Sequence, residues 1–342
     1  MSLSIPYKIY YGTRMSKFLL ALLVTASTIP AAHAADATLK NKVFSTTSFW
    51  YKPIPSWVTL HPNSYNYVQE FLRQKKTYYN TVNINLTSYT SPVYYSTWQT
   101  SKVNVKEWDC QKKGYADATL KTAWTGVPIP STALPAKGTD SEMTVYDAAT
   151  DTLWEFWRMR KTYGVWEACW GGRIKGTHSN QGIFSTYYGT TATSLPFIGG
   201  QITAEELAAG EIRHVMGISL VDAEKRTIFS WPAQRSDGVN PYYAKNRIPE
   251  GARFRLDPSV NVDALPMSRA GKIIAKAAQK YGFVVWDRAG AISLRAQNTY
   301  SYTQVGKPNP YPALFDWKQS YDVLNGFPWN KLQFLPMNYK VQ

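Results

Sequence analysis

The chain has 342 residues, and its 38 lysines and arginines against 23 acidic residues give a formal net charge of +15 at pH 7. The basic residues are spread along the chain without an arginine-rich run, a zinc-ligand pattern or an RNA-recognition motif, which argues against a nucleic-acid-binding protein. The sequence also lacks GxSxG, HExxH, P-loop and strand-following GxGxxG motifs, so no familiar catalytic signature names its function.

The first 34 residues predict an export signal. A cationic start at residues 15–17, an apolar run at residues 18–25 and the small-x-small site at residues 32–34 are typical of a signal peptide cleaved after Ala34. Because this signal has its own methionine, we expect translation to start at Met15. No later segment approaches the roughly 18 apolar residues of a membrane helix. We therefore expect a secreted or periplasmic protein without stable membrane insertion.

The mature chain stays basic. Cleavage after Ala34 removes three basic residues and no acidic one, which lowers the net charge to +12. Outside the cell this charge favours anionic partners such as uronic-acid polysaccharide, lipopolysaccharide or a wall polymer, although it can also serve solubility alone. We expect an extracellular polysaccharide as the partner and no nucleic acid.

Twenty prolines, 21 glycines and short strand-like runs between turn signals predict a mainly β protein. The expected fold is an antiparallel β-sandwich or jelly roll with about three peripheral helices. No internal repeat or linker-like segment marks a boundary. We therefore expect one compact domain, in which residues 35–135 form an N-terminal elaboration and residues 136–342 form the sandwich core.

Two features mark the N-terminal elaboration. A helix is predicted at residues 64–76, where Asn63 can act as the N-cap. Cys110 and Cys169 are the only cysteines, and an even number in an oxidising compartment predicts a disulfide. The bridge would tie this region to a tryptophan-rich strand.

Three strands are predicted in the stretch that is richest in aromatic and acidic side chains. They cover residues 143–146, 152–159 and 165–170, with a turn at residues 147–151. A flat ring can pack on the apolar face of a pyranose, and a carboxylate can bind its hydroxyl groups. Carboxylates among tryptophans therefore favour a sugar-binding sheet.

Strand alternation places three glutamates on faces that can coincide. The predicted faces group Glu142 with Tyr146, Glu155 with Trp157, and Glu167 with Cys169. If the faces coincide, the glutamates converge as the carboxyl groups of a glycosidase, which lie about 5 to 10 Å apart, and Tyr146 and Trp157 bind the substrate. In the alternative register the glutamates face water, and the core is formed by Trp154, Phe156, Trp166 and Trp170.

The glycine-rich loop at residues 171–182 is a second candidate site. With Tyr187 close behind, it holds the residue types that remove a proton beside a uronate carboxylate and neutralise that carboxylate. These residues are Arg173, His178, Asn180 and Gln181. They favour a polysaccharide lyase, and the alternative is an ordinary polar loop.

The C-terminal half begins with a helix predicted at residues 203–209 from a capping box and a terminal glycine. Strands are predicted next at residues 212–220 and 226–231. His214 shares a face with apolar residues in the first of them, so we expect a neutral, hydrogen-bonded core histidine, and the alternative is a base or a ligand.

A third candidate site lies in the polar loop after residue 231. Gln234, Arg235 and Asp237 can bind sugar hydroxyls or an acidic group at the mouth of a sheet. Alternatively, the arginine and the aspartate form a local ion pair that fixes a turn.

The last predicted elements are a strand, a helix and a pair of strands. The strand covers residues 253–256, and the helix covers residues 268–281 because apolar residues recur there at helical spacing after a serine cap. Strands at residues 283–286 and 291–295 follow, joined by a turn.

Acidic residues near the first hairpin offer oxygen ligands for a structural calcium ion. They are Asp140, Glu142, Asp147 and Asp151. Their spacing does not match a calcium-binding loop, and no other cofactor is expected.

Four segments resemble a module found in secreted bacterial proteins of largely uncharacterised function. They are residues 209–214 (AGEIRH), 229–233 (FSWPA), 248–257 (IPEGARFRLD) and 277–282 (AAQKYG). The resemblance covers roughly residues 138–297. It implies export and a β-sandwich of the kind that carbohydrate-active enzymes use, and it transfers no catalytic residue.

The sequence favours a secreted polysaccharide-active protein, either a glycoside hydrolase or a polysaccharide lyase, that acts on an extracellular glycan, with anionic glycans among the candidates. The alternative is a non-catalytic protein that binds carbohydrate or a cell surface, and a structural envelope protein is a third interpretation. A cleft with paired carboxylates or a His-Tyr-Arg trio would favour an enzyme. A flat open row of aromatic rings would favour binding.

Overall fold

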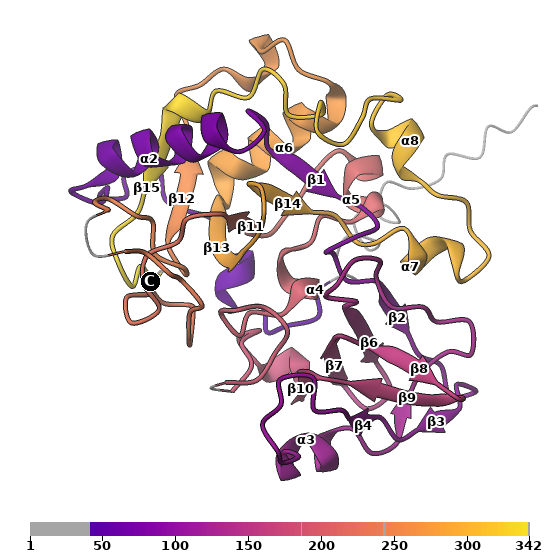
Figure 1. Cartoon of the computed structure of the whole chain (residues 1–342). Coiled ribbons are helices and arrows are strands. Elements are labelled where there is room, and N and C mark those ends of the chain that lie inside the picture. Colours follow the sequence, from indigo (N-terminus) through magenta and orange to yellow (C-terminus); the bar gives the residue numbers. More distant parts are fainter. Residues whose placement is uncertain (1–41, 186, 242–243, 341–342) are drawn as a thin grey trace, which may run out of the picture.

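The computed structural model describes residues 42–185, 187–241 and 244–340, so the predicted signal peptide lies outside the described residues (Figure 1). Within these ranges the chain is mostly strands, arranged in several sheets, with seven α-helices. The prediction of a mainly β protein is therefore confirmed. None of the helices in these ranges has the length and apolar character needed to cross a membrane.

The described strands form four sheets. The six-stranded sheet has the order β1 (Asn83–Asn85), β14 (Ser293–Arg295), β11 (Met216–Leu220), β13 (Phe283–Arg288), β12 (Arg253–Leu256) and β15 (Leu332–Phe334). The four-stranded sheet has the order β10 (Trp170–Lys175), β7 (Thr152–Trp157), β6 (Met143–Asp147) and β2 (Val93–Tyr95). The small sheets are β4 (Lys106–Glu107), β9 (Val165–Ala168) and β8 (Arg160–Thr162), and β3 (Lys102–Val103) with β5 (Val127–Pro128).

The three predicted helices are confirmed, and the structure adds shorter ones. The described α-helices are α2 (Ser64–Thr77), α3 (Ala118–Ala123), α4 (Phe197–Gly200), α5 (Ala204–Ala209), α6 (Arg269–Lys280), α7 (Tyr300–Thr303) and α8 (Tyr311–Leu314). The 3-10 helices are η1 (Phe49–Tyr51), η2 (Thr177–Ser179), η3 (Val262–Ala264) and η4 (Trp329–Lys331). Helix α5 has the predicted capping box, in which Thr203 and Glu206 accept each other's backbone N–H groups.

The sheets are mixed, whereas the sequence predicted an antiparallel arrangement. Parallel pairs join β1 to β14, β11 to β13, β2 to β6 and β4 to β9. Parallel neighbours need a crossover connection, and the chain between β11 and β13 supplies one that contains α6. The strand orders do not establish a sandwich or a jelly roll.

Several predicted strands have different bounds in the structure. The run at residues 165–170 divides at Cys169 into β9 and β10, which belong to different sheets. Residues 226–231 form no regular strand and contribute only an isolated bridge between Phe229 and Glu250. Both differences arise from pairing with distant segments, which the local pattern does not encode.

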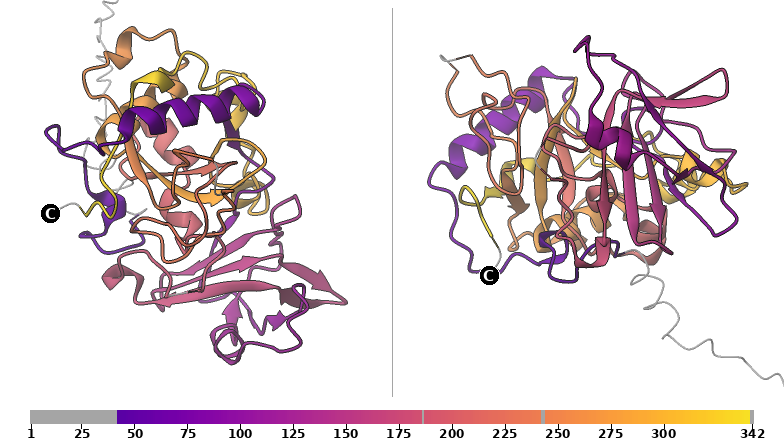
Figure 2. Two further views of the ribbon diagram at one scale, coloured as in Figure 1. Left: turned by 60° about the vertical axis from the view of Figure 1, so that its left-hand side comes forward. Right: turned by 90° about the horizontal axis from the view of Figure 1, so that it is seen from below.

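All strands from β2 to β10 lie between β1 and β11 in the sequence. We call residues 93–175 the inserted part and residues 176–203 the connecting segment. The main part is the six-stranded sheet with its helices and the loops that join them. The inserted part lies beside the main part, as the left-hand view of Figure 2 shows. The segment assigned to the N-terminal elaboration supplies β1 to one part and β2 to the other.

The alternating side chains of β13 divide the core of the main part into two sides. Phe283 and Val285 belong to the cluster that holds α2 and α6. Val284 and Trp286 belong to a cluster that also contains Leu153 of the inserted part. Because the six-stranded sheet buries apolar residues on both faces, the inserted part packs firmly against it.

The predicted disulfide between Cys110 and Cys169 is present, with the two Cα atoms 5.6 Å apart. It links the loop after β4 to the junction between β9 and β10. A disulfide is compatible with an extracellular location.

Candidate functional site

A cavity of about 480 Å³ lies where the inserted part, the connecting segment and the main part meet. The inserted part contributes Gln111, Lys113, Asp140, Trp157 and Trp170. The connecting segment contributes Tyr187, Thr190, Thr191 and Ala192, and the main part contributes Arg235, Ser236, Asp237 and Asp287. Aromatic rings and three aspartates therefore share one depression.

Two tryptophans form the aromatic side of the cavity. Trp170 lies opposite Trp157 in the antiparallel pair of β10 and β7. The Trp157 indole N–H donates a hydrogen bond to Asp140 Oδ1 at 3.1 Å. The Trp170 ring stacks on Tyr188 with centroids 5.5 Å apart, and the Lys113 ammonium lies 3.9 Å from its centroid. These contacts fix both rings before any ligand binds.

A β-bulge directs Asp287 toward the cavity. Ile218 pairs with Val285 and Ser219 pairs with Asp287, so Trp286 is the extra residue on β13. A bulge changes the direction of the side chain that follows it. The Trp286 ring lies against Gly217, where a Cβ atom would be 2.2 Å from the indole. The absence of a side chain at residue 217 therefore allows this packing.

Asp287 is partly buried and carries an ion pair. Its Oδ2 accepts a hydrogen bond from the Arg295 guanidinium at 3.1 Å, and its side chain is 17% exposed. Burial raises the pKa of Asp287 to about 6; Arg295 opposes the rise, and the charges of Asp237 and Asp140 add to it. Asp287 therefore holds a proton more readily than a surface aspartate does.

Arg295 also joins Asp287 to Glu142, a residue predicted to be catalytic. Glu142 Oε1 lies 3.9 Å from the Arg295 guanidinium, which packs over the Phe197 ring. Burial raises the pKa of Glu142 to about 7, and Arg295 opposes the rise. Glu142 is only 1% exposed and is not among the residues that line the cavity.

The three predicted glutamates do not meet in one open cleft. Thr144 pairs with Glu155, so the faces of Glu142 and Glu155 coincide, but both side chains are buried. Glu155 is fully buried, accepts a hydrogen bond from Thr190 at 2.8 Å, and has a pKa raised by burial to about 8. Glu167 lies on β9 in another sheet and pairs with Arg160 at 2.8 Å. Neither predicted register holds in full. Glu142 and Glu155 are buried although Trp154 is in the core, because both faces of the four-stranded sheet are covered.

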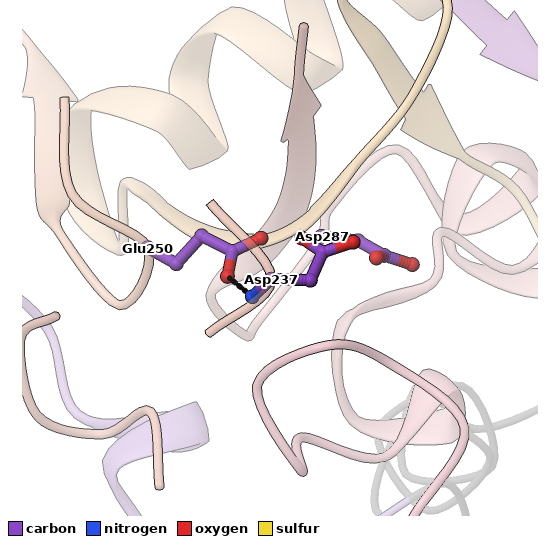
Figure 3. A group of neighbouring side chains, drawn as sticks. All are labelled: Asp237, Glu250 and Asp287. Carbon is purple, nitrogen blue, oxygen red and sulfur yellow. Dashed lines mark hydrogen bonds between the residues drawn. The ribbon is translucent and has the colours of Figure 1, made fainter. Parts of the chain in front are cut away.

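Three carboxylates of the main part form a compact cluster. One oxygen from each of Asp237, Glu250 and Asp287 lies within 4.8 Å of the others (Figure 3). Burial raises the pKa of Glu250 well above its usual value, and the charges of Asp237 and Asp287 raise it further. Within the described ranges, these three residues are the one group of three or more acidic, histidine or cysteine side chains whose ligand atoms lie close enough together to hold a metal ion. The acidic residues near the first hairpin do not form such a group.

The loop predicted to hold a lyase site is stabilised by local contacts. His178 is exposed, and its Nδ1 lies 2.7 Å from Asp151. Asn180 accepts a hydrogen bond from the Gly182 N–H, and Gln181 donates one to Thr47. These contacts fix the conformation of the loop, and none of the three predicted residues lines the cavity.

Three further predicted residues also lie outside the cavity lining. Arg173 donates to the carbonyl oxygens at the end of α3, and Tyr146 is buried beside Asp151. Gln234 donates to the carbonyl oxygen of Pro232. His214 is a buried, hydrogen-bonded histidine as predicted, with Nδ1 2.8 Å from the carbonyl oxygen of Val215. Burial lowers its pKa, but the Glu206 carboxylate, 3.2 Å from Nε2, and the Val215 carbonyl together raise it by more, which disfavours the predicted neutral form.

The cavity brings together residues from different predicted groups. Trp157, Tyr187, Arg235 and Asp237 all line it. Sequence reasoning missed Asp287 and assigned Trp170 to the core in one register. An aspartate directly after the apolar run at residues 283–286 is the local signal for Asp287, but the bulge that directs it depends on β11.

No family model, curated protein or solved structure matches this chain.

Proposed function

We propose that this chain is an exported glycoside hydrolase that binds a glycan in the cavity between the inserted part and the main part. The observation that carries the proposal is the lining, in which two tryptophans and a tyrosine lie beside three aspartates. Aromatic rings pack on the C–H faces of sugars, and carboxyl groups bind hydroxyls and transfer protons. The volume of about 480 Å³ falls in the range of ligand pockets and differs from a flat binding platform.

The carboxyl groups of the cavity come from both parts of the molecule. Asp140 belongs to the inserted part, whereas Asp237 and Asp287 belong to the main part. A glycosidase uses carboxyl groups on either side of the bond that it cleaves. We assign proton transfer to Asp140, because within the described residues it forms no ion pair, and Trp157 orients its carboxylate. On the opposite side of the cavity, Asp237 and Asp287 would bind hydroxyl groups of the sugar.

The charges of the lining favour a neutral glycan over a polyuronate. Three aspartates face two basic residues, Lys113 and Arg235. The Arg235 guanidinium already donates to the carbonyl oxygens of Gly189 and Thr191. Three carboxylates against two cations leave the side chains of the lining net negative, which disfavours the substrate carboxylate that β-elimination requires. The arrangement therefore supports hydrolysis better than a lyase reaction.

The test is an assay of the mature protein on a panel of neutral and uronic polysaccharides, in which reducing ends and unsaturated products are followed. We expect reducing ends without unsaturated product. Asp140→Asn should lower kcat by about 10²-fold or more. The exposed, distant Asp316→Asn is the matched control and should retain the wild-type rate.

Unsaturated product would contradict hydrolysis, and an unchanged rate in Asp140→Asn would contradict the assigned role. If no product forms while the protein is retained on a glycan gel, the non-catalytic binding alternative is correct for the glycans tested.

A further inference from the structure

The cluster of Asp237, Glu250 and Asp287 has the dimensions of a calcium site. Calcium binds oxygen ligands at about 2.3 to 2.6 Å, so two ligands on opposite sides of one ion are about 4.6 to 5.2 Å apart. The three carboxylate oxygens lie within 4.8 Å of one another, which allows all of them to reach a single ion. Magnesium keeps most of its water and is usually bound through one or two carboxylates, so a set of three carboxylates favours calcium.

Glu250 provides an independent indication of a missing partner. Its side chain is 0% exposed, and Oε1 is buried without a hydrogen-bond partner. Its other oxygen accepts a hydrogen bond from the Asp237 backbone N–H at 3.1 Å (Figure 3). Within the described part of the chain no basic side chain forms an ion pair with Glu250. A buried carboxylate oxygen without a donor or cation costs free energy, which a bound cation would remove.

The neighbouring arginines do not replace the cation. Arg235 interacts electrostatically with all three carboxylates, but its guanidinium donates to the carbonyl oxygens of Gly189 and Thr191 and forms no ion pair with Glu250. Arg295 pairs with Asp287 Oδ2, but a carboxylate oxygen has two lone pairs and can accept from the arginine while it also binds an ion.

The cluster is open on one side. Asp237 is exposed, and both it and Asp287 line the cavity, so an ion can enter from solvent. Calcium takes six to eight oxygen ligands, and the three carboxylates leave several positions for water or for ligand hydroxyls from the cavity. Glu250 forms the buried side of the site and Asp237 the accessible side.

We propose that Asp237, Glu250 and Asp287 bind one calcium ion at the floor of the cavity. The ion would link the loop at residues 231–240 to the end of β13 and would leave Asp140 available for proton transfer. The inference concerns ion binding alone and does not depend on glycan cleavage.

The experiment measures calcium binding by the mature protein after treatment with a chelator. We expect one Ca²⁺ per chain by calorimetry, an affinity near the 10⁻⁴ to 10⁻³ M typical of extracellular sites, and a Tm that rises with calcium. Terbium, which replaces calcium, should show luminescence excited through tryptophan. Magnesium at the same concentration should raise the Tm less.

Glu250→Gln keeps the shape of the side chain and removes its charge. It should weaken calcium binding by about tenfold or more and abolish the rise in Tm, as should Asp237→Asn. In chelator, Glu250→Gln should be at least as stable as the wild type at neutral pH, which shows that the variant folds. Asp140→Asn lies in the same cavity outside the cluster and should still bind calcium.

Three outcomes would overturn the proposal. They are a wild-type protein that neither binds calcium nor changes its Tm, unchanged binding in both cluster variants, and a preference for magnesium.

Discussion

Trp170 lies directly opposite Trp157 in the pair of strands β10 and β7, and both side chains line the cavity that also holds Asp140. The pairing places two large rings side by side at the junction of the two parts of the molecule. Trp157 additionally holds Asp140 through its indole N–H. The position of the Asp140 carboxylate is therefore coupled to the position of the Trp157 ring.

Replacing Trp157 should test this coupling. Trp157→Ala removes ring contact area and the hydrogen bond to Asp140, so we expect affinity for a bound glycan to fall by about tenfold, or about 1.4 kcal/mol. The measurement is affinity electrophoresis on the glycans that the wild type binds. Trp98→Ala is the control, because Trp98 is 89% exposed and lies outside the cavity. Equal effects of the two substitutions would contradict a specific role for Trp157.

Much of the local structure could be predicted from the sequence, because caps and periodicity act over short distances. Helices α5 and α6 begin directly after the predicted capping residues Thr203 and Ser268. The disulfide is predicted by the even number of cysteines and the expected oxidising compartment. The division of residues 165–170 at Cys169 could not be predicted. No breaker residue marks it, and the two halves differ only in the distant strands with which they pair.

The candidate site was predictable only in pieces. Trp157, Tyr187, Arg235 and Asp237 were recognised by residue type, but they come from segments whose approach is set by the packing of the inserted part on the main part. Glu142 and Glu155 were expected in a cleft because alternation gives a shared face. Alternation does not say that a second sheet covers that face.

The buried Glu155 predicts a pH dependence of stability. Its pKa is raised from 4.5 to about 8, so the folded state binds more protons than the unfolded state between these values. The stability contribution of Glu155 is thus fully present below pH 4.5 and is lost as the pH rises through about 8. Glu155→Gln should remove this loss. Relative to the wild type, its free energy of unfolding should rise by on the order of 5 kcal/mol between acid and alkaline pH. Urea unfolding across this range measures it, and parallel curves for the two proteins would refute the assignment.

Gly217 predicts a packing effect. A Cβ atom there would lie 2.2 Å from the Trp286 indole, so Gly217→Ala must displace the ring beside the bulge that directs Asp287. We expect a loss of about 1 to 3 kcal/mol in the free energy of unfolding. Gly290→Ala is the matched control, because a Cβ atom there meets nothing within 4 Å, and its effect should stay within about 0.5 kcal/mol. Similar losses in the two variants would contradict this explanation.

The disulfide predicts a redox-sensitive stability. Cys110 and Cys169 are 59 residues apart, and a bridge of this span restricts the unfolded chain. Replacing both by serine should lower the free energy of unfolding by about 2 to 4 kcal/mol. Chemical reduction of the wild type is the control and should give the same loss by urea unfolding. A double variant as stable as the oxidised wild type would show that the bridge contributes little.

The inserted part begins and ends at neighbouring points of the six-stranded sheet, and this arrangement allows it to be exchanged as a unit. Strand β1 ends at Asn85 and β11 begins at Met216, and only β14 separates these two strands in the six-stranded sheet. The chain therefore leaves and re-enters the sheet about 10 Å apart, which is two strand spacings. Such an insertion can be exchanged as a module: the tryptophans and the disulfide would travel with it, whereas the carboxylate cluster of Asp237, Glu250 and Asp287 would stay with the sheet. Under the proposed function, recombination at these two neighbouring points would change the bound glycan and keep the proposed ion site.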